Sequence, residues 1–153
     1  MGLFDALNIS ASGLSAERLR MDVTAENLAN AQSTQGPDGQ PYRRKEVVLQ
    51  ATGGDTTFQT VLDGAIDGRG GAGQPSAGAG VQVAAIVEDQ NPGRRIFDPG
   101  HPDADGDGYV TMPNVDSVTE MVDLISASRA YEANVTAMQT AKAMFSKTLE
   151  LLR

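Results

Sequence analysis

The chain has 153 residues, a formal net charge of −8, an aromatic content of 5% and no cysteine. This length suits one domain of ordinary size. The negative charge argues against a nucleic-acid binder and against electrostatic attachment to anionic lipid, because both need a basic face. Without cysteine, disulfides, thiol nucleophiles and cysteine-bound metals are excluded.

The first segment, residues 3–30, has the spacing of an amphipathic helix. Leu7, Leu14, Met21 and Leu28 stand seven residues apart, which places them in one row of a heptad pattern. Asn30 follows in a short segment that closes the helix, and residues 35–41 are rich in the Gly and Pro of turns. The start of the chain lacks a basic region followed by an apolar run, so no cleaved secretory signal is predicted.

The middle of the chain predicts short strands separated by turns. Strand candidates lie within residues 42–51, 56–62, 80–88, 95–97 and 109–112, where β-branched and aromatic side chains gather. Between the second and third candidates, residues 63–80 are rich in Gly and Ala without periodicity, which indicates a surface loop.

The last segment, residues 115–153, contains no Gly and no Pro and predicts one long helix. Two heptad rows run along it: Leu124, Tyr131, Met138, Phe145 and Leu152, with Met121, Ser128, Val135, Lys142 and Leu149 three residues before each. The opposite face, which includes Glu120 and Asp123, is polar and predicted to meet solvent. Each large side chain buried on such a seam contributes roughly 1.5–3 kcal/mol. The two terminal seams are therefore expected to cover each other or their copies in neighbouring molecules.

Two short motifs invite a ligand-binding interpretation. Residues 68–73 satisfy G-x-G-x-x-G, but neither a strand before nor a helix after is predicted, which favours a flexible loop. Asp103, Asp105 and Asp107 match the opening of a calcium-binding loop, yet Asn114 stands where the bidentate Glu is required. A metal site is therefore disfavoured relative to an Asp/Gly-rich turn.

The sequence shows no arrangement typical of an enzyme. His101 is the only histidine, in a Pro-flanked turn without a nucleophile pattern beside it, and the short motifs of hydrolases, metalloproteases and phosphate-binding loops are missing. We predict no catalytic residues and no cofactor.

These elements predict an α+β fold. Long N- and C-terminal helices pair as a coiled-coil domain formed by residues 1–34 plus 115–153. A small β-rich domain, residues 35–114 with the Gly-rich loop 63–80, is inserted between them.

Several segments resemble a known family. Asn27-Leu28-Ala29-Asn30 at the end of the first helix is similar to the bacterial flagellar axial proteins, which include rod, hook and hook-associated members. Tyr42-Arg43-Arg44-Lys45 before a strand resembles the rod members, as do residues 98–105, 108–110, 113–115, 120–122, 125–134 and 140–142. The resemblance covers both ends and everything after Gly80. The chain differs in a longer link over residues 32–40 and in the Gly-rich loop.

The resemblance implies a structural subunit of the flagellar rod, the shaft that crosses the periplasm and transmits torque. Its partners would be copies of itself, other proximal and distal rod proteins, rod-base components and the flagellar type III export apparatus, with no nucleic acid and no membrane span. Combined with the seams, it predicts an assembly interface of Leu7, Leu14, Met21, Asn27, Leu28, Asn30, Met121, Leu124, Tyr131, Val135, Met138, Phe145, Leu149 and Leu152. The alternative is a monomeric calcium- or ligand-binding module whose terminal helices close as a hairpin.

Overall fold

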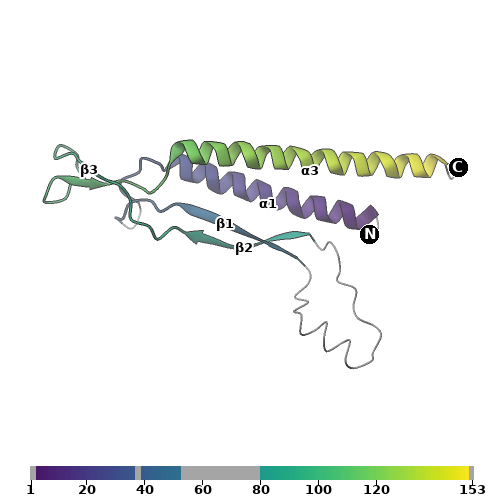
Figure 1. Ribbon diagram of the computed structural model, residues 1–153, viewed down its shortest axis with the longest axis horizontal. Helices are drawn as coiled ribbons and strands as arrows, with labels where there is room; N and C mark the ends of the chain where they lie inside the picture. The colour runs from purple at the N-terminus through teal and green to yellow at the C-terminus, as the bar shows by residue number, and fades with distance from the viewer. Residues whose placement is uncertain (1–2, 37–38, 53–79, 152–153) are drawn as a thin grey trace, which may run out of the picture. The chain divides into compact units, whose positions relative to one another are not determined.

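A computed structural model describes residues 3–36, 39–52 and 80–151 of the chain. The elements are, in order, α1 (Leu3–Ala29), β1 (Lys45–Ala51), β2 (Val81–Glu88), β3 (Arg95–Phe97), β4 (Tyr109–Thr111) and α3 (Ser117–Leu151) (Figure 1). The predicted α+β class, both terminal helices and four of the strand candidates are confirmed. The candidate strand 56–62 lies outside the described residues, as does the Gly-rich loop except for Gly80.

The helix ends follow from local side-chain hydrogen bonds. Asp116 directly precedes α3. Its carboxylate accepts hydrogen bonds from the Val118 N–H at 3.1 Å and the Thr119 hydroxyl at 3.0 Å, so it caps the first turn of the helix. At the other end of the chain, the Asn30 side-chain amide donates to the Glu26 carbonyl at 2.9 Å as α1 closes. Asn30 also accepts a hydrogen bond from Ser33, so the helix leads into the turn that follows.

The strands form two small sheets. β1 pairs with β2 and β3 pairs with β4. The second pair is antiparallel, with Arg95 opposite Thr111, Ile96 opposite Val110 and Phe97 opposite Tyr109. Bonds at the ends of the first pair, from Thr52 N–H to the Gly80 carbonyl and from Asp89 N–H to the Arg44 carbonyl, are those of antiparallel strands too.

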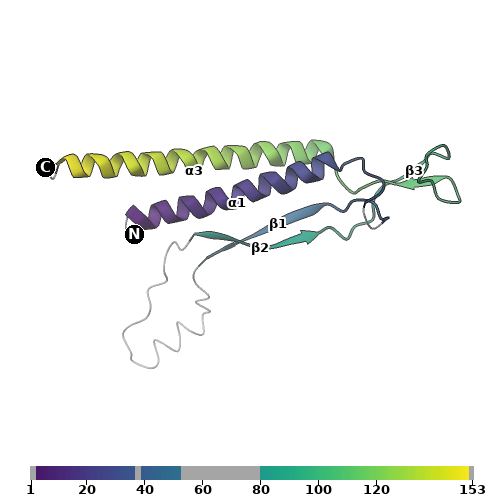
Figure 2. The ribbon, with the colours of Figure 1, turned by 180° about the vertical axis from the view of Figure 1, so that it is seen from behind.

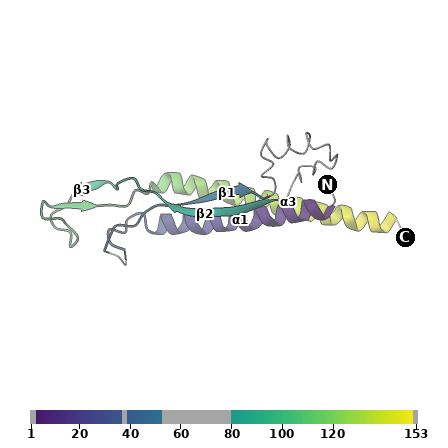
Figure 3. The same ribbon diagram turned by 90° about the horizontal axis from the view of Figure 1, so that it is seen from below.

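The chain divides into two compact units. One contains residues 1–16, 49–83 and 131–153, and the other contains residues 17–48 and 84–130. We call them the outer-helix unit and the junction unit, and each holds part of α1, α3 and the β1–β2 pair. The ribbon seen from behind and from below follows these segments along the chain (Figures 2 and 3).

In the outer-helix unit, α1 contacts both β2 and α3 through small residues. The Ser12 hydroxyl accepts the Val81 N–H at 3.0 Å, and Gly80 beside it has φ +105°, a conformation that favours glycine. A Cβ on Gly13 would lie 3.0 Å from the Asn134 side-chain nitrogen, so the missing side chain lets the two helices approach. Ala16 is buried, at 3% exposure.

The junction unit buries polar side chains together with apolar ones. Val23, Val110 and Ala127 are buried, and so are Asn27 and Glu120. The prediction that Glu120 lies on the solvent face of its helix is wrong, because its side chain is 1% exposed. Seven-residue spacing does place it in a row with the buried Ala127, but in a different row from the large side chains that suggested the seam.

Candidate functional site: a buried polar junction

Asn27 is the centre of the junction unit's polar network. Its side-chain nitrogen donates to the Lys45 carbonyl at 2.8 Å and to Glu120 Oε2 at 3.0 Å. Its side-chain oxygen accepts the Lys45 N–H at 2.9 Å and the Tyr42 hydroxyl at 2.9 Å. An amide side chain offers two donors and two acceptor lone pairs, so Asn27 uses its full capacity. The end of α1, the start of β1 and the first turn of α3 are thereby tied to one buried side chain.

Glu120 is a buried carboxylate with two different partners. Its second oxygen, Oε1, accepts a 2.6 Å hydrogen bond from Arg44 Nε, a short charge-assisted contact. The hydrogen bond to Glu120 is the main cause that raises the pKa of Arg44, against the opposing effect of burial. Arg44 also lies 3.5 Å from Asp123, and Asp123 lies 4.0 Å from Arg20 on α1. A buried charge with satisfied partners is costly to disturb, because removing one partner leaves the other desolvated and unpaired.

Tyr42 contributes the hydroxyl that completes the Asn27 network. Burial, and after it the negative charges of Glu26, Glu120 and Glu88, together raise the pKa of Tyr42 to about 12. The hydroxyl therefore stays protonated near neutral pH and acts as a donor. The Lys45 ammonium lies 5.7 Å from the centre of the Tyr42 ring and forms a 2.6 Å ion pair with Glu26.

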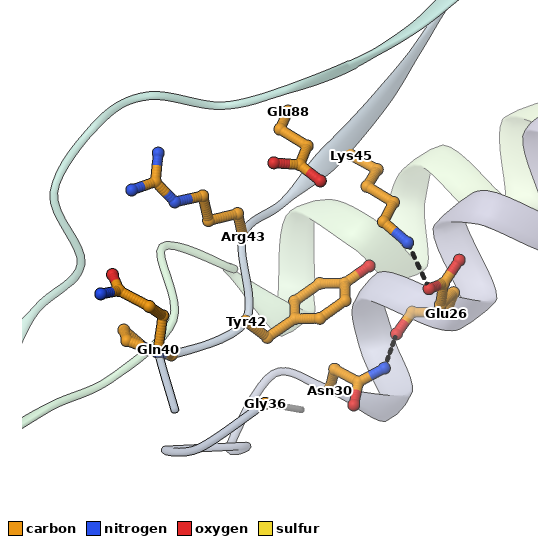
Figure 4. Close-up of a pocket in the computed structure, with 9 residues that line it drawn as sticks. Glu26, Asn30, Gly36, Gln40, Tyr42, Arg43, Lys45 and Glu88 are labelled. Carbon is orange, nitrogen blue, oxygen red and sulfur yellow. Dashed lines mark hydrogen bonds and ion pairs between the residues drawn. The ribbon is translucent and has the colours of Figure 1, made fainter. Parts of the chain in front are cut away.

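An open cavity of about 510 Å³ lies beside Tyr42 (Figure 4). It is lined by Glu26, Asn30, Gly36, Gln40, Pro41, Tyr42, Arg43, Lys45 and Glu88. Its lining mixes both signs of charge, and Figure 4 shows Lys45 directed at Glu26 and Asn30 at the backbone of α1. These contacts hold chain segments together, which is a structural role.

The Asp-rich loop uses its carboxylates in local contacts. Asp103 accepts the Thr34 hydroxyl at 2.7 Å, and Asp105 lies 3.7 Å from the Arg95 guanidinium. His101 accepts the Asp103 N–H at 3.1 Å through Nδ1. Within residues 3–36, 39–52 and 80–151, acidic, His and Cys side chains do not gather in a group of three that could hold a metal ion.

The residues predicted to form the assembly interface fall into several environments. Asn27 is buried. Met121, Phe145 and Leu149 are 46%, 41% and 52% exposed, and Leu152 lies outside the described residues. The others are half-buried: Leu7, Leu14, Met21, Leu28, Asn30, Leu124, Tyr131, Val135 and Met138. The structure brings only Asn27 of this set into the polar junction.

Sequence reasoning missed four members of the junction as functional residues. Tyr42, Arg44, Lys45 and Glu120 were not predicted to meet one another or Asn27. A signal existed, since all four lie in the segments that resemble the flagellar rod proteins. In this chain, side chains from three of those segments, 27–30, 42–45 and 120–122, meet in one hydrogen-bonded cluster.

Two family models match the ends of the chain that meet at this junction. One, described as "Flagella basal body rod protein", matches residues 7–37, and the other, "Flagellar basal body rod FlgEFG protein C-terminal", matches residues 107–151. Together with the helical ends and the short strands, these matches define a flagellar basal-body rod protein.

Full-length relatives narrow the assignment. The chain is 47% identical over 155 residues to the flagellar basal-body rod protein FlgC of Bacillus subtilis, with 99% of each chain covered. It is 45% identical over 151 residues to FlgC of Salmonella typhimurium and 42% identical over 162 residues to FlgC of Borreliella burgdorferi, and at least 98% of each chain is covered. The chain belongs to the FlgC family, whose members are structural subunits of the rod in the bacterial flagellar basal body. The resemblance inferred from the sequence is confirmed. In the described part of the chain, neither helix is long and apolar enough to cross a membrane.

Proposed function

We propose that this subunit is built into the rod through its helices and transmits torque without catalysing a reaction. In this proposal residues 1–34 plus 115–153 form a coiled-coil inner domain in the assembled rod, and residues 35–114 form the outer domain. The partners are copies of this chain, other proximal and distal rod proteins and rod-base components. Torque then passes through many packed side chains rather than through one site.

The observation that carries this proposal is the amount of apolar surface on α3. Large apolar side chains on this helix that are at least 41% exposed include Val118, Met121, Val122, Ile125, Met144, Phe145, Leu149 and Leu151. Scattered exposed apolar residues are ordinary, but a series along one helix marks a surface that a partner covers. The identity of the family supplies the partner class, which is other rod subunits.

The route of assembly follows from the same proposal. A subunit of the flagellar rod has to leave the cytoplasm before it assembles. We infer export in an unfolded state by the flagellar type III apparatus. The buried junction around Asn27 then forms after export, when the two ends of the chain come together.

A single substitution on α3 tests the role of the predicted seam. Val135 is half-buried, and Val135→Asp places a charge that is costly to bury, by several kcal/mol if unpaired. We expect the variant to be expressed and exported but to fail to assemble, which a swimming assay in a strain lacking the native subunit would detect. Gln139→Asp on an exposed position of the same helix is the matched control and should swim. Normal swimming by Val135→Asp would refute the seam assignment.

A further inference from the structure

Two aspartates in the loop between β3 and β4 are each followed by glycine: Asp105 by Gly106, and Asp107 by Gly108. An Asp-Gly bond is open to attack by its own backbone, because a following residue without a Cβ lets its amide nitrogen approach the aspartate side chain. The attack closes a cyclic succinimide, which water then opens to aspartate or to isoaspartate. The two pairs are equivalent in sequence but differ in their surroundings.

The Asp105-Gly106 pair has a geometry that favours this reaction. The Gly106 N–H donates to Asp105 Oδ1 at 3.1 Å, so the attacking nitrogen already lies beside the carboxyl group. A Cβ on Gly106 would meet no atom within 4 Å, which leaves room for the backbone to turn toward the side chain. The Asp105 carboxylate also lies 3.7 Å from the Arg95 guanidinium, but the two side chains are 72% and 55% exposed, so this ion pair restrains the carboxylate little.

The Asp107-Gly108 pair is restrained by its neighbours. The Gly108 N–H donates to the Asp105 carbonyl at 2.8 Å, so this nitrogen is engaged in the backbone hydrogen bonding of the turn. Gly108 has φ +79°, and a Cβ there would lie 3.0 Å from Phe97 Cε2, so the backbone is packed against an aromatic ring. Attack on the Asp107 side chain requires both contacts to break first.

We propose that Asp105 is a modification site, at which the native protein forms succinimide and isoaspartate while Asp107 stays unmodified. The bond that forms joins the Gly106 nitrogen to Asp105 Cγ, and the bond that breaks joins Cγ to a carboxyl oxygen. That oxygen leaves as water with the carboxyl proton and the amide proton. Water then adds either to Cγ, which restores aspartate, or to the main-chain carbonyl carbon, which breaks its bond to nitrogen and leaves isoaspartate. The overall composition is unchanged, so the reaction needs no oxidant, cofactor or partner.

Isoaspartate at this position changes the end of the β3–β4 hairpin. The main chain then passes through the side-chain carbons of Asp105 and is longer by an atom, and the former main-chain carbonyl becomes a carboxylate. In the native protein that carbonyl accepts the Gly108 N–H, and the Asp105 N–H donates to the Tyr109 carbonyl at 2.8 Å. Because both hydrogen bonds close the turn, the modification should loosen the pairing of Phe97 with Tyr109.

Ageing of the purified full-length chain at neutral pH tests the proposal. One sample stays native, and a second is kept in guanidinium chloride at the same pH, where the loop contacts are lost. Isoaspartate is located by electron-transfer fragmentation of peptides, which cleaves the Cα–Cβ bond of that residue. Location is necessary because further Asp-Gly pairs occur at 38–39, 63–64 and 67–68. We expect isoaspartate at Asp105 but not at Asp107 in the native sample, and at both positions in guanidinium chloride.

A substitution checks that the Gly106 nitrogen is the attacking atom. Gly106 does not have a positive φ, and open space surrounds it, so Gly106→Val fits the backbone. The β-branched side chain hinders the nitrogen, so the isoaspartate signal at Asp105 should be lost while the circular dichroism spectrum matches that of the native chain.

Three outcomes would overturn the assignment. The first is equal isomerisation of Asp105 and Asp107 in the native chain. The second is an Asp105 that stays unmodified in the native chain, whether or not it reacts in guanidinium chloride. The third is an unchanged Asp105 signal in Gly106→Val. The first two compare sites within the unsubstituted chain, so they remain decisive even if the variant fails to fold.

Discussion

Removal of the Asn27 amide offers the sharpest test of the junction. Asn27 and Asn30 belong to the same four-residue segment at the end of α1, yet their surroundings differ. Asn27 is 1% exposed and makes four hydrogen bonds to three other residues, Tyr42, Lys45 and Glu120. Asn30 donates within its own helix end and accepts from Ser33 nearby. Replacing each with Ala removes the same chemical group from two environments.

The structure sets the size of the expected difference. In Asn27→Ala, the Lys45 N–H and carbonyl lose their side-chain partner, and each unsatisfied buried group costs about 1–3 kcal/mol. The Tyr42 hydroxyl can turn toward the neighbouring open cavity and Glu120 keeps Arg44, so these two groups are left out of the sum. The loss in free energy of unfolding is then about 2–6 kcal/mol. Asn30→Ala should cost about 0.5–1 kcal/mol, because its bond lies at a helix end that water can reach.

Two measurements check this expectation. Urea unfolding followed by circular dichroism gives the change in the free energy of unfolding for both variants. Hydrogen exchange of the Lys45 amide gives a local measure, because that proton is donated to Asn27 Oδ1. Asn27→Ala should accelerate exchange at Lys45 strongly, and Asn30→Ala should leave it nearly unchanged. If the two variants unfold within about 1 kcal/mol of each other, which is smaller than the cost of one unsatisfied buried group, the network does not stabilise the junction as argued.

Three further predictions concern charge, pH and backbone conformation. Glu120→Gln should lower the free energy of unfolding by about 1.5–3 kcal/mol, because it weakens the buried charge-assisted hydrogen bond to Arg44. Glu46 also lies near Arg44, but its side chain is 71% exposed, so Glu46→Gln should change the free energy by less than about 0.5 kcal/mol in the same urea titration. Below pH 10 the Tyr42 hydroxyl is protonated in both the folded and the unfolded chain. Between pH 10 and about 12 only the unfolded chain loses this proton, so the free energy of unfolding should fall over that window. Tyr42→Phe should reduce that fall, and an unchanged pH profile would contradict it. Gly80→Ala should lower the melting temperature because of its positive φ and its contact with α1, while Gly106→Ala, with open space around it, should not.

Much of the fold was predictable because its causes are local. The absence of Gly and Pro after residue 114 predicts the long helix, and the structure begins that helix at Ser117, directly after the capping Asp116. The Gly and Pro residues between positions 35 and 41 predict the break in the chain between α1 and β1. Strand positions 45–51 and 81–88 agree with the β-branched runs that suggested them.

The candidate site was less predictable because its causes are distant in sequence. Heptad spacing predicted a seam through the large side chains of α3, and its contact with a partner stays a prediction. Of those side chains, Leu124, Tyr131, Val135 and Met138 are half-buried. The most buried positions on this helix are Glu120 and Ala127. A glutamate on a helix is normally solvated, and only Arg44 and Asn27 make its burial tolerable. Neither partner can be identified from the spacing of residues within α3.

The sequence by itself determined the two helices, the short strands and the family to which the chain belongs. These depend on periodicity, turn residues and matching segments, all of which act over a few residues at a time. Only the tertiary structure decided that Asn27 and Glu120, which are 93 residues apart, share a hydrogen bond in the interior. Burial of a polar group depends on partners that folding brings to it, so the chain has to fold before those partners are defined.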